Sequence, residues 1–182
     1  SGQVLAQGAV TCDRQALEQV LEGFRGDILQ IPPMYSALKR NGKKLYELAR
    51  KGKTVVRDPR PVTISALEII SQEAPEHYTL RVRCSKGTYI RTLCHDIGQV
   101  LGCGGVMDAL RRTQAAGFTL TQAATMEQVL QAAENGTAEA LLTPVDRFFD
   151  CYPALTIGGR AEQLCRNGNP FPWDGGDGTY RV

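Results

Sequence analysis

The chain changes from strand to helix within the stretch Cys84-Ser85-Lys86-Gly87-Thr88-Tyr89-Ile90-Arg91-Thr92-Leu93. Before it, residues 78–84 alternate large or apolar side chains with polar ones, which is the period-2 pattern of a half-buried strand. After it, apolar residues recur at helical spacing as far as Leu101, and Gly102 follows where a helix would end. Residues 85–88 are therefore predicted to form a strand-to-helix turn, with a sharp backbone at Gly87 and Thr88 as the helix cap.

This turn presents three side chains that suit one binding or catalytic site. Lys86 is a cation that can hold a phosphate or a carboxylate, Tyr89 is a phenol that can stack and transfer a proton, and Arg91 offers a planar fork to a carboxylate. Functional groups are often held at such positions by a rigid scaffold. In the alternative interpretation, Tyr89 belongs to the core and the two cations are solvated surface, and the spacing alone does not decide between them.

The other apolar patterns predict an α+β fold with a mixed, largely antiparallel sheet flanked by helices. Two adjacent strands, 62–70 and 78–84, have a short connection that favours antiparallel pairing, and the apolar phase of the first shifts near Leu67 as at a bulge. The remaining expected elements are a strand at 1–12, a helix from the cap Asp13 to Gly26, a strand at 112–118, and a helix that begins at the capping box Thr125-x-x-Gln128.

Bulk composition is ordinary for a soluble globular protein. The residues are 42% hydrophobic and 22% charged, and the length of 182 residues suggests one domain or one and a half. No apolar run approaches the length of a membrane span, and the first residues lack the basic and apolar parts of a signal peptide. A cytoplasmic location without a membrane partner is the default expectation.

The cysteines and histidines do not predict a metal centre. There are six cysteines without a Cys-x-x-Cys pair and only two histidines, so a zinc site is not expected and the cysteines are interpreted as reduced, mostly buried thiols. Cys94 and His95 are neighbours on an expected helix and point in different directions, which disfavours a Cys–His nucleophile pair.

Positive charge is concentrated between residues 39 and 60. The formal net charge is only +2, but this segment holds nine basic residues against two acidic ones, an asymmetry typical of a polyanion-binding face. Asn41-Gly42 predicts a hairpin, residues 44–51 a short amphipathic helix ended by Gly52, and Tyr46 places a ring among the cations. The alternative is a solvated helix face. The RNA-binding candidates here are Lys39, Arg40, Lys43, Lys44, Arg50, Lys51 and Lys53.

From about Cys151 the composition changes, because glycine and proline punctuate short apolar pieces. This pattern predicts the start of a small β-rich module over residues 151–182. The run Asp174-Gly-Gly-Asp-Gly is interpreted as a turn, since it lacks the further spaced ligands of a calcium loop.

Four stretches, in this order along the chain, together resemble the TruB family of tRNA pseudouridine synthases. They cover most of residues 14–118, and the region after 150 is similar in placement to the PUA-like RNA-binding domain that ends many family members. The stretches are Phe24–Asp27 with Gln30–Lys39, Gly42–Gly52, Cys84–Leu93 and Ala109–Arg112.

The resemblance implies an enzyme that isomerises one uridine of the tRNA T loop, position 55, with no cofactor or metal. The base is flipped out, its glycosidic bond is broken, and it is rejoined to the ribose through carbon. The implied partner is the T arm of tRNA, and no protein partner is required. Residues 1–150 would be a partial catalytic domain with a basic insertion at about 39–60, and residues 151–182 the start of a PUA-like module.

Residue roles follow from the matching positions. Tyr89 would line the uracil pocket and transfer a proton, Arg91 would pair with the nucleophilic aspartate, and Leu110 would pack against the base. The insertion would close over the tRNA arm, with Lys86, Arg111 and Arg112 as further RNA-binding candidates.

The sequence departs from the family at the nucleophile. The family's aspartate lies in a Gly-x-Leu-Asp-Pro-type motif that these 182 residues do not contain, and a second tyrosine that stacks on the base would also precede residue 1. We therefore expect a fragment that lacks the N-terminal part of the catalytic domain, is inactive alone, and can self-associate through exposed sheet edges. The rival interpretation is a non-catalytic module that binds structured RNA.

Overall fold

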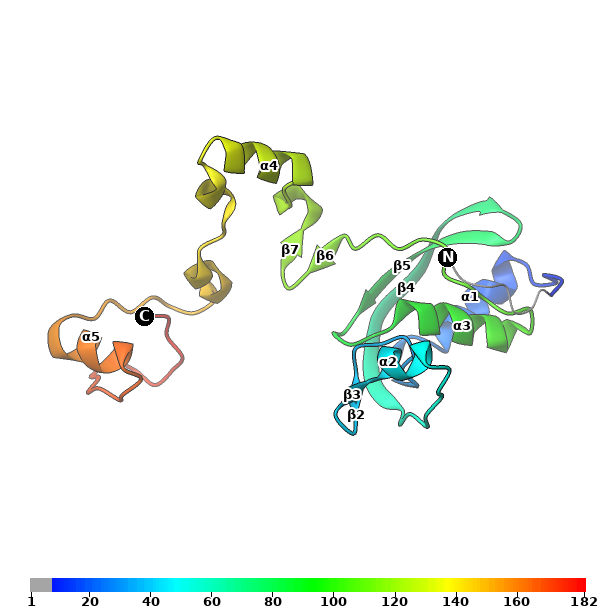
Figure 1. The fold of residues 1–182 in the computed structure, drawn as a ribbon, viewed down its shortest axis with the longest axis horizontal. Helices are drawn as coiled ribbons and strands as arrows, with labels where there is room; N and C mark the ends of the chain where they lie inside the picture. Colours follow the sequence, from blue (N-terminus) through cyan, green and yellow to red (C-terminus); the bar gives the residue numbers. More distant parts are fainter. Residues whose placement is uncertain (1–7) are drawn as a thin grey trace. The chain divides into compact units, whose positions relative to one another are not determined.

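The computed structural model describes residues 8–182, which form two compact units that meet in the sequence between Arg111 and Arg112 (Figure 1). The first unit carries the elements α1 (Arg14–Glu22), β1 (Gly26–Gln30), β2 (Lys39–Arg40), β3 (Lys43–Lys44), α2 (Leu45–Arg50), β4 (Arg60–Ala74), β5 (His77–Cys84) and α3 (Ile90–Leu101). Residues 1–7 of the expected strand 1–12 lie outside the described residues, and residues 8–12 form no helix or strand.

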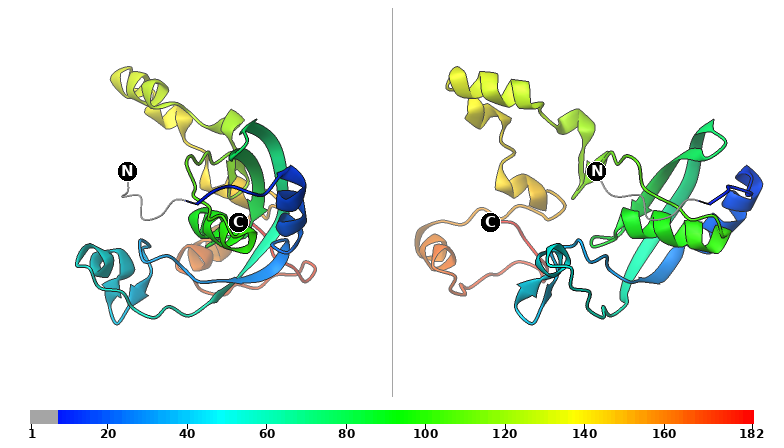
Figure 2. Two further views of the ribbon diagram at one scale, coloured as in Figure 1. Left: turned by 90° about the vertical axis from the view of Figure 1, so that its right-hand side faces the viewer. Right: turned by 45° about the vertical axis from the view of Figure 1, so that its right-hand side comes forward.

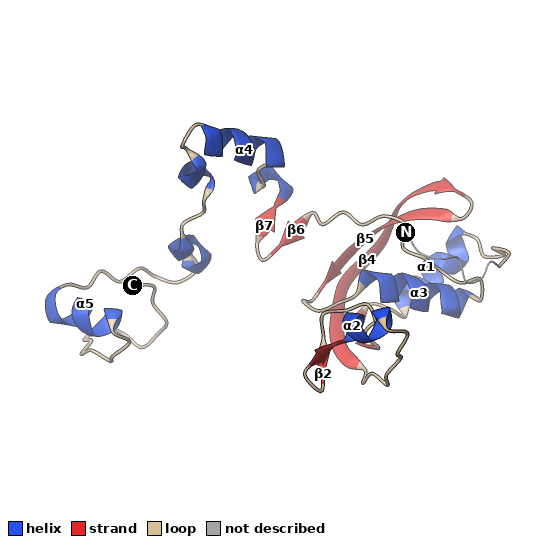
Figure 3. Ribbon diagram, viewed as in Figure 1, coloured by secondary structure: helices blue, strands red, loops and turns tan. Residues whose placement is uncertain are grey.

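The first unit is built on a three-stranded antiparallel sheet in the order β1-β4-β5, which confirms the predicted α+β class (Figure 3). Ile28 of β1 lies opposite Val62 of β4, and Leu67 of β4 opposite Val82 of β5. A register shift between Ile64 and Ala66 confirms the expected bulge. Because β1 and β5 are the outer strands of this sheet, each presents an edge.

The core lies between the sheet and two helices. Figure 2 shows α3 lying across one face of the curved sheet, and α1 packs beside α3 on β4. Ile64 and Leu67 are fully buried, and the bulge between them explains how both face the helices although their sequence separation is odd. The buried cluster consists of Leu17, Leu21, Ile64, Leu67, Leu93 and Ile97.

The helix termini follow most of the sequence signals. Gly87 has φ +87° in the strand-to-helix turn and Gly102 has φ +77° at the end of α3, both as predicted. The prediction that Thr88 caps α3 is wrong. The cap residue is Tyr89, without a side-chain cap bond, because the Thr88 hydroxyl instead donates to the Ser85 carbonyl at 2.9 Å within the turn.

Asp13 caps α1 as predicted, since its Oδ1 accepts the Ala16 N–H at 2.8 Å. We expect Asp13→Ala to lower the free energy of unfolding by about 1 kcal/mol, because one N–H of the first turn loses its acceptor. Asp13→Asn keeps an acceptor and should lose less than half of that, as measured by urea unfolding followed by circular dichroism. Equal losses for the two variants would assign the effect to the charge near the helix N-terminus instead.

The second unit contains short elements. The expected strand 112–118 is instead a hairpin of β6 (Gln114–Ala115) and β7 (Phe118–Thr119), because Ala116 and Gly117 both take positive φ and turn the chain. The predicted capping box of Thr125 and Gln128 is confirmed at the start of α4. The unit also holds η1 (Leu120–Gln122), α4 (Met126–Glu134), η2 (Ala138–Leu141), η3 (Val145–Phe149) and α5 (Gly159–Arg166).

Residues 151–182 are not β-rich in the structure. The helix α5 occupies the middle of this segment, and one parallel bridge joins Ala154 to Arg181. The guanidinium of Arg181 is 2.9 Å from a carboxylate oxygen of Asp150, and the rings of Trp173 and Tyr180 meet edge to face. Glycine and proline therefore mark loops around a helix here rather than turns between strands.

Candidate active site and nucleic-acid interface

The turn after β5 is anchored to the neighbouring strand β4. The Ser85 N–H donates to the Thr63 carbonyl at 2.8 Å, and the Thr63 N–H donates to Ser85 Oγ at 3.0 Å. Because both bonds lie at the turn itself, Lys86 and Tyr89 project from a fixed piece of backbone at the end of the sheet. This is the scaffold that the sequence predicts for a site.

Tyr89 is held by a side chain from β1. Gln30, the last residue of β1, accepts the Tyr89 N–H through its Oε1 at 2.8 Å and donates from Nε2 to the Tyr89 carbonyl at 3.1 Å. Tyr89 is half-buried, so it is neither a core residue nor a freely solvated one. The alternative interpretation, in which Tyr89 belongs to the core, does not describe its position.

A cavity of about 420 Å³ lies beside Tyr89. Two cations line it, Lys86 from the turn and Arg60 from the start of β4, and the lining contains no acidic residue. A cavity lined by a phenol ring and two positive charges suits a ligand that has a planar base and an anionic phosphate, as a nucleotide does. The lining residues are Leu38, Arg60, Pro61, Val62, Lys86, Gly87 and Tyr89.

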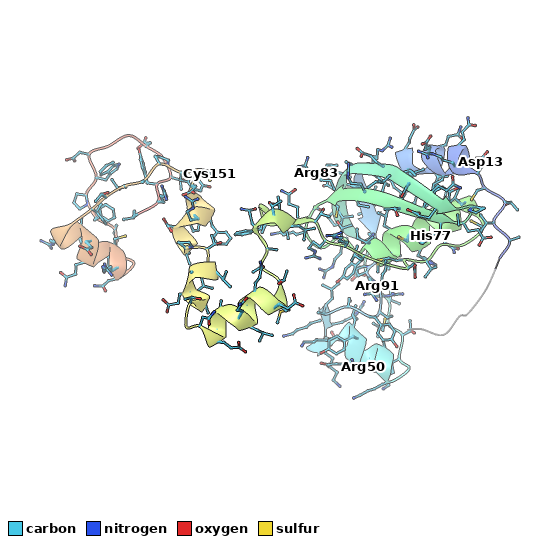
Figure 4. The ribbon with its side chains drawn as sticks, turned by 90° about the horizontal axis from the view of Figure 1, so that it is seen from above. Asp13, Arg50, His77, Arg83, Arg91 and Cys151 are labelled. Carbon is cyan, nitrogen blue, oxygen red and sulfur yellow. The ribbon has the colours of Figure 1, made fainter. Side chains whose placement is uncertain are left out.

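Arg91 follows Tyr89 by two residues in the first turn of α3, and its side chain is exposed. In Figure 4 it is seen between α3 and the part of the chain that carries Arg50. Its Nη2 donates to the Tyr35 carbonyl at 2.9 Å, the single hydrogen bond of this guanidinium within residues 8–182. The other N–H donors of the fork are available to an anionic partner.

The described aspartates offer no nucleophile beside Arg91. Burial raises the pKa of the Asp96 carboxyl, the opposite of what a cation at hydrogen-bond distance would do. Asp27 accepts a hydrogen bond from the Thr63 hydroxyl at 2.6 Å. Within residues 8–182 no carboxylate lies within ion-pair distance of Arg91, in line with the missing Gly-x-Leu-Asp-Pro motif.

The basic insertion is a hairpin followed by a one-and-a-half-turn helix. Asn41 and Gly42 both have positive φ between β2 and β3, which confirms the predicted turn, and α2 ends before Gly52 at φ +66°. Tyr46 on α2 lies between two cations, with Lys44 Nζ 5.5 Å and Arg50 Cζ 5.3 Å from the ring centroid. The insertion therefore combines an aromatic ring with two neighbouring positive charges.

The cations of the insertion are mostly exposed. Lys44 is half-buried, and the backbone of residues 45 and 46 is tied to the segment before the hairpin by bonds to the Leu38 and Ser36 carbonyls. Arg40 donates to the Val56 carbonyl, so its charge is partly fixed. The exposed members are Lys39, Arg40, Lys43, Arg50, Lys51 and Lys53.

Leu110 and the two arginines after it are not part of the cavity lining. Leu110 is 58% exposed on a segment without regular structure, where Asp108 Oδ2 lies 3.7 Å from His77 Nε2. Arg111 ends the first unit and Arg112 begins the second, and both are exposed. The structure thus brings together Lys86 and Tyr89, with Arg91 adjacent in α3, but not Leu110.

Sequence reasoning missed two residues that build this site. Gln30 is 2% exposed; it belongs to a stretch that resembles the family, but its only local signal is that it is a single polar residue within the apolar run 28–31. Arg60 lies opposite Gln30 in the β1–β4 ladder and lines the cavity. It belongs to the basic segment, but no local signal singles it out, because strand pairing, not sequence distance, brings it next to Lys86.

The other potential metal ligands and nucleophiles do not form a second site in the described part of the chain. No group of three or more potential metal ligands occurs among residues 8–182, and no helix there is long and apolar enough to cross a membrane. All six cysteines are free, but the expectation that they are mostly buried is wrong, since Cys84 and Cys151 are exposed and the others are half-buried. Burial raises the pKa of the Cys94 thiol, which makes it a poor nucleophile.

Two family models match consecutive parts of the chain. The TruB family pseudouridylate synthase N-terminal domain matches residues 1–90, and the tRNA pseudouridylate synthase B C-terminal domain matches residues 91–150. The chain is 51% identical over 156 residues to tRNA pseudouridine synthase B of Azoarcus sp. strain BH72, covering 86% of this chain and 51% of that protein. It is 49% identical over 172 residues to the Pseudomonas paraeruginosa protein of the same name, covering 93% and 56% respectively. The chain therefore spans about half the length of the curated relatives it matches.

Solved structures agree on the fold. The chain resembles a chain of a Cbf5-Nop10-Gar1 complex with a TM-score of 0.62 and 26% identity, covering 81% of this chain and 42% of that one. It also resembles a chain of an H/ACA RNP bound to a substrate RNA containing 2'-deoxyuridine, with a TM-score of 0.63, 22% identity, and coverage of 91% and 47%. Because both family domains match in order over residues 1–150 and relatives are about 50% identical to it over the aligned residues, the chain belongs to the TruB family of pseudouridine synthases.

Proposed function

We propose that this chain acts in a tRNA pseudouridine synthase that converts uridine 55 of the T loop to pseudouridine. The observation that carries the proposal is the cavity at the end of β5, where Tyr89 and Lys86 stand on an anchored turn with Arg91 adjacent in the same helix. The names of the curated relatives support the reaction and the tRNA substrate.

The proposed reaction exchanges one bond to the ribose for another and consumes no cofactor. The bond from N1 of uracil to C1′ breaks and a bond from C5 to C1′ forms, while the proton on C5 leaves and N1 takes up a proton, so that substrate and product are isomers. Tyr89 would line the uracil and move a proton, because its phenol is half-buried beside the cavity. Arg91 would hold the nucleophilic carboxylate, and Leu110 would pack against the base once the segment that carries it is placed by RNA.

The two cations of the cavity and those of the insertion would bind the RNA. Lys86 and Arg60 would contact phosphates next to the flipped nucleotide, since neither has an acidic neighbour in the lining. The T arm would lie along the insertion, where Lys44 and Arg50 flank the Tyr46 ring, and Arg111 and Arg112 would be further RNA contacts.

The domain assignment is part of the proposal. Residues 1–150 would contribute to the catalytic domain, with the insertion at about 39–60, and residues 151–182 would begin a PUA-like module. A cytoplasmic location follows from the tRNA substrate. The edges of β1 and β5 would allow self-association when nothing else covers them.

The test is tritium release from tRNA that carries C5-tritiated uridine, with a full-length enzyme that contains this chain. Wild-type tRNA should release tritium in proportion to pseudouridine formed at position 55, and a transcript with cytidine at that position should release none from the T loop. Tight tRNA binding without tritium release would instead support the non-catalytic RNA-binding module.

The insertion should make tRNA binding salt-dependent. Replacing Lys43, Lys44, Arg50 and Lys51 with glutamine should reduce the slope of log affinity against log salt by about 0.7 to 0.9 for each phosphate that the protein no longer neutralises. Fluorescence anisotropy with labelled tRNA at several salt concentrations measures this slope. Arg14 and Arg81 are matched control positions, because each already faces a glutamate. An unchanged slope would indicate that other cations contact the phosphates, with Arg111 and Arg112 as the next candidates.

A further inference from the structure

Gln30 makes a paired contact with a residue 59 positions further along the chain. It is 2% exposed, it ends β1, and both polar atoms of its amide bind the backbone of one residue, Tyr89. The bonds measure 2.8 Å from the Tyr89 N–H to Oε1 and 3.1 Å from Nε2 to the Tyr89 carbonyl. Gln30 thus supplies to the Tyr89 backbone the hydrogen-bond acceptor and donor that a neighbouring strand would supply.

Tyr89 needs such a partner because of its place in the chain. It lies past the end of β5 with extended backbone angles, φ −98° and ψ 104°, and it precedes the first helical residue of α3. Its carbonyl also accepts the Leu93 N–H at 3.0 Å, but its own N–H has no strand to pair with. Without Gln30, this N–H would be left without an acceptor in a half-buried place.

We propose that Gln30 is a positioning residue that sets where the Tyr89 phenol stands in the cavity. The proposal rests on the proposed function, in which Tyr89 contacts the uracil. The two bonds fix both the N–H and the carbonyl direction of Tyr89, so they define the direction of its Cα–Cβ bond. A misplacement of about 1 Å can cost about 10²-fold in rate when a reacting group must be aligned.

Gln30, whose amide holds the backbone of Tyr89, also pairs with a residue of the cavity wall. Gln30 pairs with Arg60 in the β1–β4 ladder, and Arg60 lines the cavity together with Tyr89. Paired residues of two antiparallel strands point to the same face of the sheet. Gln30, at the end of β1, therefore neighbours both Arg60 and Tyr89. The contact of Gln30 with Tyr89 therefore belongs to the site and adjoins the core, since the Leu93 N–H also bonds to the Tyr89 carbonyl.

Two variants of Gln30 separate the two bonds. Gln30→Met keeps the length and shape of the side chain and loses both bonds, whereas Gln30→Glu keeps the acceptor for the Tyr89 N–H and loses the donor to the carbonyl. In the full-length enzyme we expect kcat to fall by about 10- to 10²-fold for Gln30→Met and by less for Gln30→Glu, with tRNA affinity unchanged. Gln19→Met, on the exposed side of α1, is the matched control and should leave kcat unchanged.

A double-mutant cycle distinguishes positioning from general stability. If Gln30 acts by placing the phenol hydroxyl, Gln30→Met should cost little further rate in a Tyr89→Phe background, since that hydroxyl is already gone. Additive losses, or a wild-type kcat for both Gln30 variants, would overturn the proposal. Gln30→Glu provides the same cycle if Gln30→Met does not fold, as judged by circular dichroism. A Tyr89→Phe enzyme with full activity would instead overturn the proposed role of Tyr89, and so the two failures are distinguishable.

Discussion

The 182-residue chain by itself is expected to release no tritium from a T-arm RNA that carries C5-tritiated uridine. None of its nine aspartates stands in a Gly-x-Leu-Asp-Pro context, and no carboxylate among residues 8–182 lies within ion-pair distance of Arg91. The roles proposed for its side chains are to bind a base, to hold a carboxylate and to move a proton. These side chains cannot attack the ribose, and without a nucleophile the covalent part of the reaction has no first step.

The control for this assay is a full-length relative such as the Azoarcus enzyme, which should be active on the same RNA. The chain should still bind the RNA, so binding measured on the same sample shows that it is folded. Tritium release that survives purification and disappears with Tyr89→Phe would contradict the prediction and would place a nucleophile within these residues.

In a full-length enzyme that contains the chain, Arg91→Lys is expected to reduce the rate of the chemical step by about 10²-fold or more while tRNA affinity stays the same. Arg91 uses one donor on the Tyr35 carbonyl, which holds the guanidinium in place at the start of α3 and leaves the rest of its fork to a carboxylate. The fork fixes the orientation of a carboxylate and keeps it ionised. Lysine retains the charge but not this geometry.

Single-turnover kinetics separate the two effects of Arg91→Lys, because binding and chemistry are then measured apart. Arg83→Lys is the matched control, since Arg83 is an exposed arginine on the neighbouring strand β5 and should tolerate the change. Weaker tRNA binding with an unchanged chemical step would identify Arg91 as a phosphate contact and would contradict its catalytic assignment.

Local signals in the sequence predict most elements of the first unit. The alternation before Cys84, the apolar spacing after Ile90 and the Asn41-Gly42 turn each depend on neighbours within a few residues, and each is confirmed. Local signals fail where two of them compete. Thr88 is a good cap residue, but its hydroxyl binds the Ser85 carbonyl inside the turn.

The second unit shows the limit of composition as a predictor. Glycine and proline after Cys151 are compatible with turns between strands and equally with loops around a helix, and α5 forms there. The strand expected at 112–118 folds back on itself, because Ala116 joins Gly117 at positive φ, a conformation that the identity of an alanine does not indicate.

By itself, the sequence determined the class of fold, the strand-to-helix turn with Lys86 and Tyr89, the basic hairpin and helix, and the resemblance to a family, because these depend on short spacings and on residue identity. Only the tertiary structure decided that Gln30 and Arg60 belong to the same site, 59 residues and 29 residues from Tyr89 along the chain. The physical reason is strand pairing. The β1–β4 ladder and the bulge in β4 set which side chains share a face, and no local pattern indicates either the register or the buried partner of a single glutamine.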